Sequence, residues 1–335
     1  MDYTVTDTVE LARQLVRNDI PGDYTKSEMQ ECLRQALIAA NGGTDKINPR
    51  TFRNSEAYTI IEKTLDTIIE DTFKEDDLWN SLVETISVSG GDTNEFFIED
   101  DSLFIVSEIG RGTQTVRRQR FQSGTSVQIP VRSHAIKTFE HYDRILTGRI
   151  DFNSFVEKVN RSYTQYNYEQ VYRIFSGINA TTEGMYADVY KSGTYDEDTI
   201  LNIIDHIEAD TGAKAFIIGS RPALRHLKPD IDVISTGAKD DMYNMGYYGK
   251  FNGTDTIVVR QRNIAGTHDF VFPQDRIYII AGDEKPIKRV EEGDTMLITR
   301  DSFDNADLTQ EYLVSKRFGT GLIMRHAIGC FVFSD

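Results

Sequence analysis

Residues 103–177 read LFIVSEIGRGTQTVRRQRFQSGTSVQIPVRSHAIKTFEHYDRILTGRIDFNSFVEKVNRSYTQYNYEQVYRIFSG, and a change of hydrophobic period inside this stretch decides the fold. Before residue 150, β-favouring residues are interrupted by breakers such as Gly110, Gly112 and Pro130. This pattern predicts four short strands, over 103–107, 113–121, 126–131 and 135–139. We expect these strands to form a long two-stranded ribbon.

The period changes at Asp151. From there to Gly177, apolar residues recur every three to four positions, which is the spacing of one face of an α-helix. Asp151 is a typical N-cap, and glycine is a typical residue just beyond a helix end. At about 1.5 Å per residue, the predicted helix is roughly 35–40 Å long. A helix of this length indicates a structural spine.

The predicted ribbon has too few apolar residues to form a core of its own, and an isolated two-stranded ribbon is marginally stable in water. Two interpretations stay open: the ribbon lies on another molecule, or it folds back on its own domain. The charges favour the first interpretation. Residues 1–108 hold 23 acidic and 9 basic side chains, whereas residues 109–150 hold 2 acidic and 8 basic ones. A basic arm can dock on an acidic neighbour.

The 335-residue chain has a net charge of −16, so it is not expected to wrap nucleic acid, which requires a dense positive surface. Helices are predicted over 7–17, 26–40, 54–73, 196–210 and 222–227. Further strands are predicted over 85–88, 96–98, 215–218, 247–251, 256–260, 276–281, 295–300, 308–318 and 321–333. Asn252-Gly253 predicts a hairpin turn, and Gly319-Thr320-Gly321 predicts a break between the last two strands.

No motif for chemistry emerges from the residues. The glycine pairs lack the third glycine of a dinucleotide loop, and the six histidines are scattered. No apolar run reaches the roughly 18 residues of a membrane span. We therefore expect no catalytic residue, cofactor, metal or membrane partner.

Two phrases carry a resemblance to a known family. FEHYDRI at 139–145 leads through TGRID at 147–151 into the long helix, and YLVSKRFG at 312–319 precedes GLIMRHAIG at 321–329. With the order of elements over residues 50–335, they resemble a tailed-bacteriophage major capsid protein of the Hong Kong 97 type, an α+β fold. The resemblance implies the following division: N-terminal arm 1–53, peripheral-domain helix and strands 54–102, extended loop 103–149, spine helix 150–195, axial domain 196–294, and closing strands 295–335 shared by the peripheral and axial domains.

The resemblance also implies a function. The chain would assemble as pentamers and hexamers into an icosahedral shell around a DNA genome, with weak non-specific DNA contact. Its other partners would be portal, scaffolding and decoration proteins. It would be made in the host cytoplasm and reside in the virion, without enzymatic activity. Two alternatives are kept: an encapsulin-type compartment shell, and a cytosolic α+β enzyme.

The charge asymmetry gives a hypothesis for the contact between subunits. The ribbon arginines would pair with acidic clusters of the adjacent subunit, because these are the densest opposite charges in the chain. The arginines are Arg111, Arg117, Arg118, Arg120 and Arg132, and the acidic residues are Glu75, Asp76, Asp77, Glu99, Asp100 and Asp101.

Overall fold

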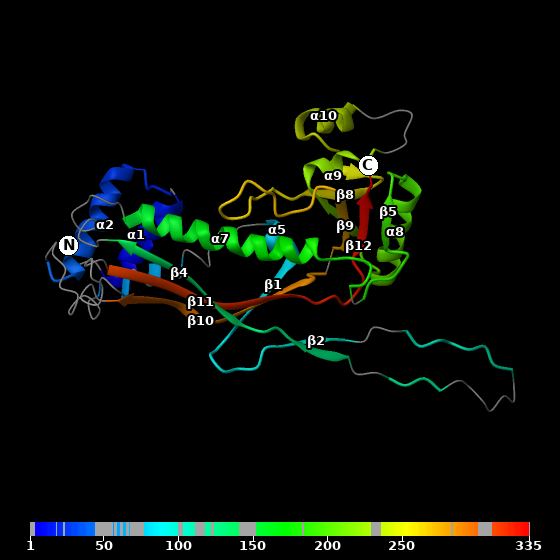
Figure 1. Ribbon diagram of the computed structural model, residues 1–335, viewed down its shortest axis with the longest axis horizontal. Coiled ribbons are helices and arrows are strands. Elements are labelled where there is room, and N and C mark those ends of the chain that lie inside the picture. Colours follow the sequence, from blue (N-terminus) through cyan, green and yellow to red (C-terminus); the bar gives the residue numbers. More distant parts are fainter. Residues whose placement is uncertain are drawn as a thin grey trace.

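One long helix organises the molecule. The computed structural model describes residues 4–17, 19–22, 24–43, 56, 59, 60, 63, 64, 67, 77–99, 103–110, 118–121, 124–140, 152–182, 184–228, 236–282, 284–300 and 310–334. The helix is α7 (Phe152–Ser176), and it runs through the middle of an elongated body (Figure 1). The spine helix predicted over 151–177 is therefore confirmed, while its proposed N-cap lies outside the described residues.

A four-stranded sheet covers one side of α7. Its order is β1 (Val83–Val88), β10 (Ile287–Arg300), β11 (Gln310–Leu322) and β4 (Arg132–Glu140). The first pair is parallel and the other two are antiparallel. Tyr163 of α7 is buried against Val314 and Phe318 of β11, and its hydroxyl donates to the Val314 carbonyl at 2.8 Å. The spine and the closing strand thus share one core.

A six-stranded sheet stands at the C-terminal end of α7 (Figure 1). Its order is β5 (Tyr190–Gly193), β12 (Gly329–Phe333), β9 (Arg276–Ala281), β6 (Ala215–Gly219), β8 (Thr254–Val258) and β7 (Lys250–Phe251). Helix α8 (Glu197–Thr211) buries four isoleucines against it: Ile200, Ile203, Ile204 and Ile207. Tyr278 of β9 donates its hydroxyl hydrogen to the Phe175 carbonyl of α7 at 2.7 Å, which joins this sheet to the spine.

Helices lie at both ends of the body (Figure 1). α1 (Val5–Arg17) and α2 (Lys26–Ala40) pack beside the first half of α7, and α9 (Arg221–Arg225) and α10 (Thr236–Met245) lie near the second sheet. Thr25 and Glu28 form a capping box that fixes the start of α2 at the predicted residue. The helix predicted over 54–73 falls largely outside the described residues, although those described within it are helical.

The hairpin predicted at Asn252-Gly253 is confirmed. Both residues have positive φ, 46° and 91°, and they join β7 to β8. Elements with weaker patterns were not predicted: α5 (Asp77–Leu82), β5 and α10. The first half of β10 was also missed, since its charged residues do not alternate with apolar ones as a half-buried strand normally requires.

The break predicted at Gly319-Thr320-Gly321 is wrong. β11 continues through both glycines to Leu322, and a separate strand, β12, begins only at Gly329. A Cβ at Gly319 would lie 2.4 Å from the Pro130 carbonyl oxygen, closer than any side chain tolerates. The glycine allows another segment to cross the strand at contact distance, which sequence alone does not distinguish from a turn.

The ribbon differs from its prediction in where its strands pair. β2 (Glu95–Ile98) pairs with β3 (Thr125–Gln128), antiparallel, so the ribbon spans residues 95–128. Residues 103–110 and 118–121, here called the first and second limb, are not in strands, and β4 belongs to the four-stranded sheet instead. The strand prediction over 103–107, the described part of 113–121, and the placement of 135–139 in the ribbon are wrong. β-propensity identifies extended backbone but not its partner.

Candidate intersubunit surface

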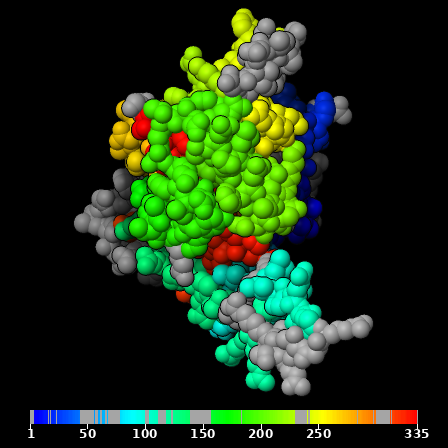
Figure 2. All heavy atoms as spheres, turned by 90° about the vertical axis from the view of Figure 1, so that its right-hand side faces the viewer, coloured from blue at the N-terminus to red at the C-terminus, as the bar shows by residue number. Residues whose placement is uncertain are grey.

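The ribbon projects from the body (Figure 2). Large apolar side chains along it are exposed to solvent. Leu103 and Val106 are 93% and 94% exposed, and Phe121 on the opposite limb is 75% exposed. The other large apolar side chains exposed along the ribbon are Phe97, Phe104, Ile105, Ile109 and Val127. An apolar patch of this extent on a protruding element indicates an interaction site.

The root of the ribbon is fixed to the body. Phe96 and Ile129 are buried with Val290 and Ile323 in a small core on the face of the four-stranded sheet turned away from α7. The Asn94 side-chain amide donates to the Ile129 carbonyl at 2.6 Å. The ribbon therefore leaves the body in a defined direction.

Beyond the root, and among the described residues of the ribbon, the Gln119 side chain joins the two limbs. The backbone N–H of Ile105 donates to Gln119 Oε1 at 2.7 Å, and Gln119 Nε2 donates to the Ile105 carbonyl at 2.8 Å. The Gln119 side-chain amide thus makes the two hydrogen bonds that a residue of an opposite strand would make. The described residues of the two limbs form no β-ladder with each other. Most backbone groups of the first limb remain available to another strand.

The structure places the predicted arginines in different surroundings. Arg118 and Arg120 are exposed on the second limb, and Arg132 is exposed at the start of β4. No ion pair joins these three to an acidic residue within the described chain. Arg111 and Arg117 lie outside the described residues.

The two described acidic residues of the predicted set lie on different elements. Asp77 begins α5, whereas Glu99 directly follows β2 at the root of the ribbon, with its carboxylate 3.7 Å from Arg325. Glu75, Asp76, Asp100 and Asp101 lie outside the described residues. Glu99 thus belongs to the arm itself and has a partner in its own chain, and the pairing of the arginines with acidic groups of an adjacent subunit stays a prediction.

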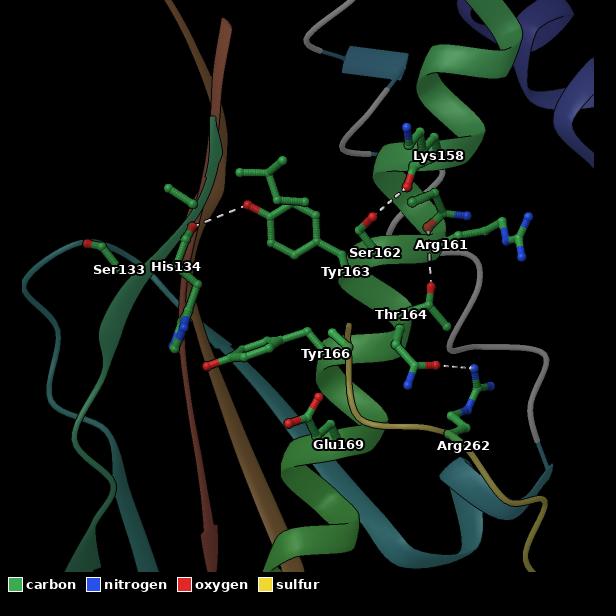
Figure 3. A pocket seen from close by; sticks show the side chains of 15 residues that line it. Ser133, His134, Lys158, Arg161, Ser162, Tyr163, Thr164, Tyr166, Glu169 and Arg262 are labelled. Carbon is green, nitrogen blue, oxygen red and sulfur yellow. Dashed lines mark hydrogen bonds between the residues drawn. The ribbon is translucent and has the colours of Figure 1, made fainter. Parts of the chain in front are cut away.

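A groove follows α7 along the edge of the four-stranded sheet (Figure 3). Its volume is about 920 Å³, and it is bounded by residues 133–136 of β4, by α7, and by the loop that carries Arg262 and Ala265. Tyr163 reaches across its floor and donates to the His134 carbonyl at 3.2 Å. Burial raises the pKa of Tyr163 to about 12, so this hydroxyl keeps its proton.

A buried ion cluster lies between α7 and the four-stranded sheet. Arg289 and Lys316 are 1% and 2% exposed, and Glu291 bridges them at 2.8 and 3.2 Å. Arg289 also donates to the Asn167 side chain at 3.0 Å and lies 4.1 Å from the Phe318 ring centre. Burial opposes ionisation of Glu291, but the two cations outweigh it and hold the pKa of Glu291 below its ordinary value.

The sequence interpretation missed both the apolar ribbon surface and this cluster. Leu103-Phe104-Ile105-Val106 was a usable signal, because four successive apolar residues in a segment without a core partner imply an external one. Arg289 and Lys316 gave no comparable signal, since charged residues in a strand ordinarily face water.

The described residues contain no group of three or more metal-ligating side chains. Within the same part of the chain, no helix is long and apolar enough to span a membrane.

Comparison with known proteins places these features in a family. Residues 11–332 match the family described as the SPbeta prophage-derived putative capsid protein YonB. The mature capsid of bacteriophage PhiM1 has a similar structure, with a TM-score of 0.51 and 10% identity over 76% of this chain and 86% of that one. The capsid of cyanophage P-SCSP1u gives 0.50 and 10% over 77% and 88%. At this low identity, the structural likenesses show the fold alone. In a separate comparison, no curated protein matches the sequence.

Proposed function

The chain belongs to the family described as the SPbeta prophage-derived putative capsid protein YonB, and from this membership we propose that it closes a phage shell by docking its ribbon on neighbouring copies. It is a structural major capsid protein of a tailed bacteriophage with the Hong Kong 97-type α+β fold, and its place is the capsid of the virion. The finer assembly is our proposal: pentamers and hexamers of this one chain form an icosahedral shell around double-stranded DNA.

The observation that carries the docking proposal is the exposed apolar ribbon on a fixed root. Leaving Leu103 and Val106 almost fully in water forgoes about 1.5–3 kcal/mol each relative to burial. A neighbouring copy that covers the ribbon recovers this free energy. Because each copy both gives and receives a ribbon, many modest contacts act together in the closed shell.

The ribbon arginines supply orientation in this proposal. Arg118 and Arg120, with Arg111, Arg117 and Arg132, pair with acidic groups of the adjacent copy. The cluster Glu75–Asp77 is the better acceptor, since Glu99 belongs to the donor arm and contacts Arg325 of its own chain. Such pairs act on the rate and specificity of docking more than on affinity.

The remaining partners follow from the same role. Portal and scaffolding proteins would start and guide assembly, and decoration proteins would bind the finished shell. Packaged DNA would meet the chain only through weak non-specific contacts, because the protein is strongly acidic. Synthesis would take place in the host cytoplasm, and the role requires no enzymatic activity.

Electron microscopy of the purified chain tests this function. We expect uniform round particles from the unmodified chain. The variant Arg117→Glu/Arg118→Glu is expected to give at least tenfold fewer particles, with an unchanged unfolding midpoint of the unassembled protein. A small oligomer of the unmodified chain would refute the shell, whereas full particle yield from the variant would refute only the arginine pairing.

A further inference from the structure

The groove along α7 collects cations that have no acidic partner in the described part of their own chain. Lys158 and Arg161 are exposed on its α7 wall, and Arg262 reaches it from the neighbouring loop. Figure 3 shows Arg161 and Arg262 extending on the same side of the helix. Among the described residues that line the groove, the one acidic side chain is Glu169, which already accepts from Arg173 at 2.6 Å. The groove is thus a positive surface on a chain whose net charge is −16.

Arg262 is held in place by α7. The Gln165 side-chain amide donates to the Asn263 carbonyl, which ties the loop to the helix. The guanidinium carbon of Arg262 lies 3.9 Å from the Tyr168 ring centre, and its Nη1 donates to Gln165 Oε1 at 3.4 Å. A guanidinium carries five N–H donors, and Arg262 makes no further hydrogen bond to the described residues. Its position is therefore fixed while donors remain for a ligand.

The spacing of the cations indicates the kind of anion. Lys158, Arg161 and Gln165 occupy successive turns of α7, so the cations, with Arg262 beside Gln165, extend over roughly 10 Å of the helix axis. One strand of DNA carries a phosphate about every 3.4 Å along its axis, so about three successive phosphates match this length. An extended acidic peptide matches less well, because its side chains alternate and one face presents a carboxylate only about every 7 Å.

We propose that the α7 groove binds the phosphate backbone of the packaged DNA. This inference rests on the proposed shell function, which supplies the nucleic acid. The hydroxyl groups of Ser162 and Thr164 already donate to Lys158 and Asn160 within α7, so the cations dominate the contact and the base sequence is not read. The acidic remainder of the chain repels the duplex, which confines the contact to the groove and keeps it weak.

Fluorescence anisotropy of a short labelled DNA duplex, titrated with the unassembled full-length chain, tests the site. Each neutralised phosphate contributes about −0.9 to the slope of log affinity against log salt concentration, so three contacts give a slope of about −2.7. Lys158→Gln/Arg161→Gln should weaken binding at least tenfold at low salt and reduce the slope to about −0.9. An unchanged unfolding midpoint shows that this variant folds.

Arg225→Gln/Lys228→Gln is the matched control. These two residues are also an arginine and a lysine three positions apart, exposed and without an ion pair among the described residues. They lie at the end of α9 and do not line the groove. We expect this variant to keep the affinity and the slope of the unmodified chain. Equal weakening in the two variants would mean that DNA responds only to total charge, and would overturn the inference.

Competitors identify the anion. Pyrophosphate, polyglutamate and unlabelled duplex are compared at equal concentrations of negative charge, and we expect only the duplex to displace the labelled DNA. Displacement by pyrophosphate would assign the groove to small phosphates, and displacement by polyglutamate would assign it to an acidic protein segment. Either result overturns the DNA site. Because binding is measured on the unassembled chain, such a failure leaves the particle test intact, whereas an absence of particles would refute the shell alone.

Discussion

The ribbon and the six-stranded sheet both contain apolar residues in extended segments, but the sheet buries them and the ribbon exposes them. In β9, Ile277, Ile279 and Ile280 are buried by helix, strand and spine, whereas Leu103, Ile105 and Val106 of the first limb face water. Both segments are apolar and extended. The difference teaches that the sheet completes its core within one chain, while the ribbon leaves its apolar surface for assembly.

The largest expected effect lies in the body, at the buried ion cluster. Glu291→Gln removes the buried carboxylate that bridges Arg289 and Lys316, and we expect the unassembled chain to lose about 3–5 kcal/mol of unfolding free energy. Denaturant titration measures this. Lys137→Met is the matched control, because its ion pair with Glu311 is half exposed and is worth less than about 1 kcal/mol. Equal losses in both variants would contradict the role of burial.

A second experiment compares one apolar truncation in each region. Ile279→Ala should cost about 2–5 kcal/mol of unfolding free energy, because it opens a cavity in a closed core. Val106→Ala should change the same quantity by less than about 0.5 kcal/mol, since its side chain is 94% exposed. Particle yield should respond in the reverse sense for Val106→Ala, falling without loss of stability. A large stability loss at Val106 would mean that the ribbon packs on its own chain.

The same contrast explains what the sequence could predict. The spine helix and α2 were predicted to within about a residue because period and capping are local properties. The Gly319 position was misread because its meaning depends on Pro130, nearly two hundred residues away. The ribbon was predicted from its charge to be an arm, which stays a prediction, and its bounds lie at 95–128 because strand pairing is a long-range property. Arg289 and Lys316 were missed, since their burial depends on the packing of β10 and β11 against the distant spine helix.

The buried ion cluster should also make stability depend on pH. The pKa of Glu291 is lowered in the folded chain, so its contribution is fully present above the ordinary glutamate range. It is lost as the pH falls through the lower folded pKa. Unfolding free energy of the unassembled chain should therefore decline below about pH 4.5, and the decline should be shallower in Glu291→Gln. Parallel curves for the two proteins would assign acid sensitivity to other carboxylates.

The smallest effect is expected in the ribbon, at the side chain that joins its limbs. Gln119→Met keeps the length of the side chain but removes both hydrogen bonds to Ile105. One such bond is worth about 0.5–1.5 kcal/mol, so exchange of the Ile105 amide hydrogen should accelerate up to about tenfold in the unassembled chain. Amide hydrogens of β9 should exchange at an unchanged rate, because global unfolding of the body does not depend on the hydrogen bonds between Gln119 and Ile105. If Gln119→Met also accelerated exchange in β9, the ribbon would be part of the cooperative fold, and the contrast between the two regions would fail. If the acceleration is confined to the first limb and disappears in assembled particles, the neighbouring copy supplies the order that the limb lacks alone.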